Sequence, residues 1–175
     1  MVIDLGMPLD DAQTSSLGQV LGRLKDEHGA LKKELDHVQE MTSHMVGVLG
    51  TDESKRLLQE IRKQMVTFMQ QLEAHEHWEE VEVLPLLTEY ANQGMEPTFL
   101  TSTWVLEEDH KQAERFVRSF LDYADQCEGA DSIKLKKAIT LLSVACSVLS
   151  EHLISEEEMV FPIANRMLER CLRQI

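Results

Sequence analysis

Apolar residues recur at steps of three and four along four long stretches of this chain. That spacing places them on one face of an α-helix, and the alternation expected of a β-strand does not occur. The stretches predict helices over residues 17–49, 52–90 and 97–125, and a fourth from residue 131 or 132 whose stripe ends at Met167. Because short loops between long helices favour antiparallel neighbours, the pattern predicts an all-α fold, an up-down-up-down antiparallel four-helix bundle.

Residues that stop and cap helices stand at the predicted boundaries. A short polar segment, residues 1–16, precedes the first helix and is interpreted as a lead-in, so the bundle domain is predicted over residues 17–175. The boundary residues are Gly50, Thr51, Asp52, Asn92, Gly94, Pro97, Gly129, Asp131 and Ser132.

Histidine and glutamate interrupt the apolar stripes in a repeated pattern, His-x-x-x-Glu. Four residues turn an α-helix through about 400°, so each histidine and its glutamate point the same way, one turn apart. Imidazole nitrogen and carboxylate oxygen are donors that suit iron, manganese or zinc. The copies are His75/Glu79, His110/Glu114 and His152/Glu156, and His28 stands upstream without a following carboxylate.

Antiparallel packing can bring the polar positions of the four helices to one height in the core. Burying so many ionisable groups without a partner would cost several kcal/mol each, so we expect a pair of metal ions bridged by the glutamates. The alternatives are a solvated helix face, which the apolar stripes argue against, and a buried hydrogen-bonded network without metal. The predicted ligands are His28, His75, Glu79, His110, His152 and Glu156.

The other polar candidates are less constrained by the pattern. Glu114 is a further ligand, an outer hydrogen-bond acceptor or a partly exposed charge, and Glu107 either orients His110 or lies at a solvated edge. Helix phase turns the remaining histidines away from the core, so they are predicted on the surface. These are His37, His44 and His77.

Two prolines repeat one spacing, because Pro85 and Pro162 each follow a stripe histidine by ten residues. A proline inside a helix removes one backbone hydrogen bond and bends the helix. The local strings are HEHWEEVEVLPLL and HLISEEEMVFPIA, and their likeness indicates an internal duplication of a helix pair.

Composition excludes some partners. The 175 residues include 17 basic and 31 acidic side chains, a formal net charge of −14, which argues against nucleic acid or anionic lipid as partners. No continuous run of about 18 apolar residues and no secretory signal occur, so a cytoplasmic protein without a membrane span is expected. The three cysteines match no zinc or redox motif and are predicted to be reduced thiols. They are Cys127, Cys146 and Cys171.

The two proline-containing strings resemble the hemerythrin-like, or HHE cation-binding, family, and the resemblance extends over about residues 17–167. It implies a four-helix bundle around two non-haem iron ions, for which zinc or manganese could substitute. The ligands that the resemblance implies are His28, His75, Glu79, His110, His152 and Glu156.

The chain departs from the oxygen-carrying members at two positions. Those proteins have a second histidine where this chain has Glu114, and they end with His-x-x-x-x-Asp where this chain has His152 and Glu156. A carboxylate in place of an imidazole favours ferric iron and would close the position that dioxygen needs, so reversible oxygen storage is not expected. The set of four histidines and two glutamates is more similar to bacterial di-iron proteins linked to iron–sulfur cluster repair and nitric oxide.

The resemblance therefore implies a metal-binding protein that binds or senses a small oxidant, namely dioxygen, nitric oxide or peroxide. The alternatives are a di-iron redox enzyme that removes peroxide or nitric oxide, and an iron donor in iron–sulfur cluster repair. The sequence separates these poorly because all would use the same ligands. It favours binding over catalysis narrowly, and leaves open whether the chain forms homo-oligomers.

Overall fold

The structure, a computed structural model, describes residues 11–92, 99–127 and 132–173. Within these ranges all regular elements are helices and no strand occurs, which confirms the all-α prediction. A short π-helix, η1, follows the second α-helix. The elements in order are α1 (Asp11–Gly47), α2 (Asp52–Trp78), η1 (Glu79–Val83), α3 (Leu84–Asn92), α4 (Phe99–Asp125) and α5 (Ser132–Arg173).

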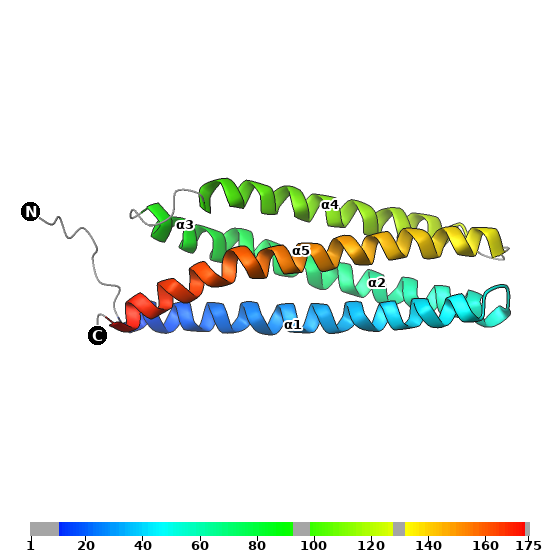
Figure 1. Cartoon of the computed structure of the whole chain (residues 1–175), viewed down its shortest axis with the longest axis horizontal. Helices are drawn as coiled ribbons and strands as arrows, with labels where there is room; N and C mark the ends of the chain where they lie inside the picture. Colours follow the sequence, from blue (N-terminus) through cyan, green and yellow to red (C-terminus); the bar gives the residue numbers. More distant parts are fainter. Residues whose placement is uncertain (1–10, 93–98, 128–131, 174–175) are drawn as a thin grey trace, which may run out of the picture.

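The long helices lie side by side along the longest axis of the molecule (Figure 1). α1 packs against α2 and α5, and α4 packs against the same two helices. The start of α1 and the end of α5 lie at the same end of the bundle (Figure 1). The four long helices therefore enclose a common core, as the apolar stripes require.

This core consists of two apolar clusters with a polar layer between them. On α1, Leu24 belongs to one cluster and Leu31 to the other, and the buried His28 lies between them. α2 and α5 repeat this order, with His75 and Glu156 at the corresponding positions. The predicted ligands thus occupy one level of the bundle, sealed on both sides by apolar side chains.

The first helix begins at Asp11, six residues before the predicted start at Leu17. No glycine or proline stands between these positions, so no helix-breaking residue prevents the helix from extending beyond the N-terminal end of its apolar stripe. It ends at Gly47, two residues before the predicted end, and the predicted stop and cap follow: Gly50 has a positive φ of 88°, and the Thr51 side chain accepts a hydrogen bond from the Ser54 amide. The predictions for residues 1–10, Gly94, Pro97, Gly129 and Asp131 concern residues outside the described ranges.

The helical stretch predicted over residues 52–90 is present, but the structure divides it into α2, η1 and α3, a division that was not predicted. In η1 the backbone hydrogen bonds run from residue i to i−5, as from the Leu84 amide to the Glu79 carbonyl. Pro85 follows immediately and has no amide hydrogen to offer a preceding carbonyl, so a regular α-helical ladder cannot continue through this point. Pro162 differs, since it lies inside α5 without a break.

Part of α5 is apolar enough to resemble a membrane span. An 18-residue window within residues 132–170 has a mean hydropathy of 1.6, and the core helix of a soluble protein passes the same test of length and composition. The face carrying Leu135, Leu142 and Leu149 is fully buried in the bundle. We therefore interpret α5 as the central core helix of the described fold.

Candidate metal centre

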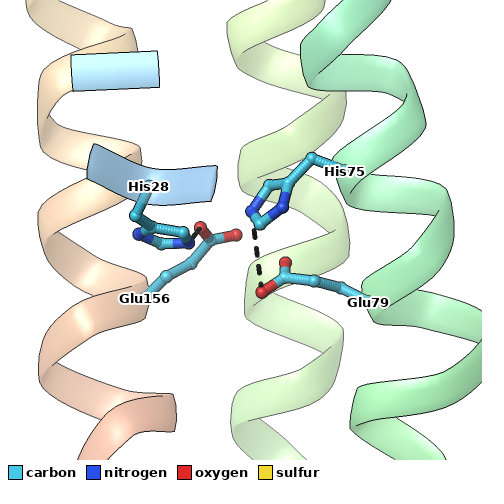
Figure 2. Close-up of side chains that lie close together, drawn as sticks. All are labelled: His28, His75, Glu79 and Glu156. Atoms are coloured by element: carbon cyan, nitrogen blue, oxygen red, sulfur yellow. Dashed lines mark ion pairs between the residues drawn. The ribbon is translucent and has the colours of Figure 1, made fainter. Parts of the chain in front are cut away.

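The six predicted ligands come together in the polar layer, and each is at most 4% exposed. His28 comes from α1, His75 and Glu79 from the junction of α2 and η1, and the others from α4 and α5. Figure 2 shows four of them, from α1, the junction of α2 and η1, and α5, pointing toward one another. The four in Figure 2 are His28, His75, Glu79 and Glu156.

Glu156 is the centre of the layer, because its two oxygens face histidines of different helices. Its Oε1 lies 2.9 Å from His110 Nε2 and 3.3 Å from His152 Nε2. Its Oε2 lies 3.2 Å from His28 Nε2. One carboxylate therefore contacts imidazoles from α1, α4 and α5.

Glu79 is placed in a similar way, at slightly longer distances. Its Oε1 lies 3.8 Å from His75 Nε2, and its Oε2 lies 3.9 Å from His110 Nε2. The imidazoles form two pairs, His28 with His75 and His110 with His152, each with ring centroids 4.9 Å apart. Each carboxylate thus directs one oxygen toward each pair, the arrangement expected of a ligand that bridges two cations.

Glu76 is a site residue that the sequence analysis missed. It lies half-buried beside the second pair, with Oε1 3.9 Å from His152 Nε2. Donor atoms of Glu76, His110 and His152 all lie within 4.8 Å of one another and could hold a metal ion. The sequence offered one sign of this role: Glu76 directly follows His75 and therefore lies about 100° around the helix from it. The other group that could hold an ion consists of His28, His75, Glu79 and Glu156.

A carboxylate outside the layer fixes the ring of His75. Glu27 Oε2 lies 2.8 Å from His75 Nδ1, and because an ionised carboxylate can only accept, Nδ1 donates and Nε2 faces the layer. Arg23 holds Glu27 in turn at 2.7 Å, and its guanidinium stacks on Trp78, 3.9 Å from the ring centroid. A chain of contacts therefore joins a ligand of the layer to the surface of α1.

Two more histidines have a similar outer neighbour. Glu157 lies 3.5 Å from His28 Nδ1 and pairs with Lys32, and Glu80 lies 3.4 Å from His110 Nδ1. Such contacts orient metal-bound imidazoles and raise their basicity. The sequence analysis missed Glu27, Glu80 and Glu157, although each is the immediate neighbour in the chain of a predicted ligand.

The two central carboxylates differ in their protonation. Burial and the neighbouring Glu156 raise the pKa of Glu79 well above its usual value. Burial alone would also raise the pKa of Glu156, but contacts from His110, His28 and His152 outweigh it and hold that pKa well below its usual range. These surroundings therefore favour the charged form of Glu156 and the neutral form of Glu79.

The histidines respond to burial in different ways. Burial lowers the pKa of His152 to about 4 and also lowers that of His75, where Glu27 offsets part of the effect. For His110 burial acts in the same direction, but contacts with Glu156 and other carboxylates dominate and raise its pKa. Burial raises the pKa of Glu76 to about 7. Burial therefore favours the neutral form of His75 and His152, the form in which imidazole binds metal.

Unpartnered atoms in the layer fit a bound cation. Leaving a buried polar atom without a hydrogen bond costs about 1–3 kcal/mol, and such atoms are rare in proteins. Among the described residues, most of these atoms belong to the layer, and their donor chemistry matches that of iron, manganese or zinc. They are His28 Nδ1 and Nε2, His75 Nε2, Glu76 Oε1, Glu79 Oε1, His152 Nδ1 and Nε2, and Glu156 Oε2.

The remaining predicted candidates lie away from the layer. Glu114 is partly exposed and pairs with Arg118 at 2.6 Å, so it belongs to neither group of donors. The side chain of Glu107 lies outside the described residues. The three histidines predicted on the surface, His37, His44 and His77, are all exposed, which confirms their predicted helix phase.

Two cysteines are buried free thiols, Cys127 and Cys146. Burial raises the pKa of both, that of Cys146 to about 11, so neither is readily converted to the reactive thiolate. This fits the prediction that they are reduced. The side chain of Cys171 lies outside the described residues.

Residues 19–164, most of the chain, match the family described as the hemerythrin HHE cation binding domain. No curated protein and no solved structure matches the chain.

Proposed function

Because the chain belongs to the hemerythrin HHE cation-binding domain family, we propose that its polar layer holds two non-haem iron ions that bind or sense a small oxidant. Dioxygen, nitric oxide and peroxide are the candidates. The proposal includes the up-down-up-down order of the bundle, which the packing of consecutive helices supports.

One observation carries the proposal of two ions rather than one. Glu79 and Glu156 each direct separate oxygens toward two different pairs of imidazoles. A single ion would need only one oxygen from each carboxylate and would leave one pair of rings unused. The first position would be held by His28 and His75, the second by His110, His152 and Glu76, and both carboxylates would bridge.

Iron suits this mixed set of nitrogen and oxygen donors, and bound iron would supply reversible electron transfer and an open position for a small ligand. The chain's own residues provide the surroundings. The apolar clusters flank the layer along the bundle, and Glu27 orients His75 so that Nε2 faces inward.

The deciding experiment is metal analysis combined with optical spectroscopy. The purified chain, loaded anaerobically with ferrous iron, should hold two irons per chain and give a new visible absorption band on exposure to one of the three oxidants. A chain that retains no iron, or iron without any spectral response to all three, would refute the proposal.

The same preparation separates the alternatives. A redox enzyme would consume many equivalents of peroxide or nitric oxide per chain, whereas a binding protein would respond to about one. An iron donor would pass its iron to a metal-free acceptor faster than iron is lost to buffer. We favour binding or sensing, in a cytoplasmic protein that does not engage nucleic acid or membranes.

A further inference from the structure

One ligand of the layer, His152, also lines a small surface pocket. The pocket has a volume of about 130 Å³ and lies between α4 and α5. Its other lining residues are mostly polar and include two carboxylates. They are Asp109, Gln112, Val148, Glu151 and Ser155.

His152 differs from the other three histidines in its outer nitrogen. The Nδ1 atoms of the other rings each have a carboxylate within 3.5 Å, whereas the buried Nδ1 of His152 has none within ion-pair distance among the described residues. Its Nε2 faces Glu156 and Glu76, at 3.3 and 3.9 Å. Neither ring nitrogen of His152 has a hydrogen-bond partner among the described residues, so the neutral ring can carry its proton on Nε2 and leave the Nδ1 lone pair free.

We propose that this pocket is the uptake route for divalent cations, in which Asp109 and Glu151 capture the hydrated ion and His152 Nδ1 is its first nitrogen ligand. The inference rests on the proposed metal centre and adds the path by which it is filled. Because His152 is fixed by carboxylates on its inner side only, its ring can move aside more readily than the rings of the other three histidines.

A second groove that reaches the layer is less suited to a cation. It lies between α1 and α2, has a volume of about 280 Å³ and ends at His75. There Arg23 and Glu27 neutralise each other at 2.7 Å, and Glu27 already occupies the Nδ1 atom of His75. The α4–α5 pocket therefore combines two carboxylates with a free nitrogen, whereas the α1–α2 groove keeps one further carboxylate, Glu34, and offers no free nitrogen.

The test is the rate at which the metal-free full-length chain takes up cobalt(II), followed by its visible absorption in a stopped-flow instrument at low ionic strength. Asp109→Asn/Glu151→Gln should slow uptake roughly five- to tenfold and reduce its dependence on salt, since both carboxylates steer the cation. The matched control is Asp36→Asn/Glu40→Gln, which removes the same charge from the exposed surface of α1 and should keep the wild-type rate.

A third variant, Ser155→Met, fills the pocket without changing its charge and should also slow uptake. Circular dichroism of each variant verifies the helical fold. Wild-type rates in both pocket variants, or equal slowing in the surface control, would overturn the inference. A wild-type chain that takes up no cobalt would instead contradict the proposed metal centre, so the two failures are distinguishable.

Discussion

Two stretches of the bundle, residues 75–85 and 152–162, share a histidine, a glutamate and a proline at the same spacings, yet they are built differently. In the first, Glu79 begins the π-helix η1, and Pro85 lies in the next element. In the second, α5 continues through Pro162 as one α-helix. The same sequence pattern therefore gives an interrupted helix on one side of the layer and a continuous helix on the other.

The central carboxylates of the two stretches, Glu79 and Glu156, also differ in how closely they contact the imidazoles. Glu156 contacts three imidazoles within 3.3 Å and keeps its charge, while Glu79 lies at least 3.8 Å from its imidazoles and has a raised pKa. π-helical turns occur often at functional sites, where they change the direction of a side chain. We infer that α5 supplies the fixed carboxylate and that the junction of α2 and η1 supplies the adjustable one.

The largest effect should come from removing these carboxylates. Glu156→Ala should lose both metal ions, because it removes a bridge and leaves three imidazoles without their partner. Glu79→Ala should keep at least partial occupancy of the first metal position, the one held by His28 and His75. Breaking such a buried group costs about 3–5 kcal/mol, and loss of bound metal lowers the melting temperature further. Metal content per chain and thermal unfolding, with and without a chelator, measure both effects.

The control for this comparison is Glu73→Gln, because Glu73 lies exposed on α2 and contacts only Arg118 among the interactions described. It should keep two ions and the wild-type melting temperature. If the double variant lacking both central carboxylates retained two irons and full stability, the ligand assignment would be wrong.

A smaller effect is expected from Glu27, which has no counterpart at His152. Glu27→Gln should weaken metal binding at the His75 position about 10- to 100-fold, since outer hydrogen bonds to ligand histidines typically contribute that much. Competition titrations against a chelator of known affinity would resolve the two positions. Equal weakening at both positions would show that Glu27 acts through overall charge and not through the His75 ring.

The prolines allow a comparison of the two helices themselves. Pro162→Ala should stabilise the fold by about 1 kcal/mol, because it restores a backbone donor inside a continuous α-helix while the more flexible unfolded chain offsets part of the gain. Pro85→Ala should gain less, since the preceding hydrogen bonds already follow the π register. Chemical denaturation of both variants in the presence of chelator measures the difference, and equal gains would contradict it.

Much of this arrangement could be predicted from the sequence because it depends on helix periodicity. Stripes at steps of three and four place Leu24, His28 and Leu31 on one face whatever the neighbouring helix is, and the structure buries all three. The exposure of His37 and His77 follows from the same argument. Periodicity therefore identified the layer and the side chains that face it.

What periodicity could not give was any feature that depends on a local change of register or on contacts between helices. The π-helix breaks the constant turn of 100° per residue on which the stripe argument rests. Glu76 belongs to the layer because α4 and α5 approach the side of α2 that it faces, and Glu27 belongs because α1 lies against His75. Neither approach is encoded in the spacing of residues along a single helix.

The smallest effect, and the one that checks helix phase at the start of η1, concerns His77. His77→Ala should leave two ions bound and change the free energy of unfolding by no more than about 0.5 kcal/mol, because the side chain is exposed and lies two residues from a buried ligand. The matched variant His75→Ala should lose the ion at the first position. Metal analysis of the two variants tests this phase. Loss of metal from the His77 variant would mean that the other face of the helix points toward the layer at the start of η1. The contrast between Glu79 and Glu156 would then be wrong.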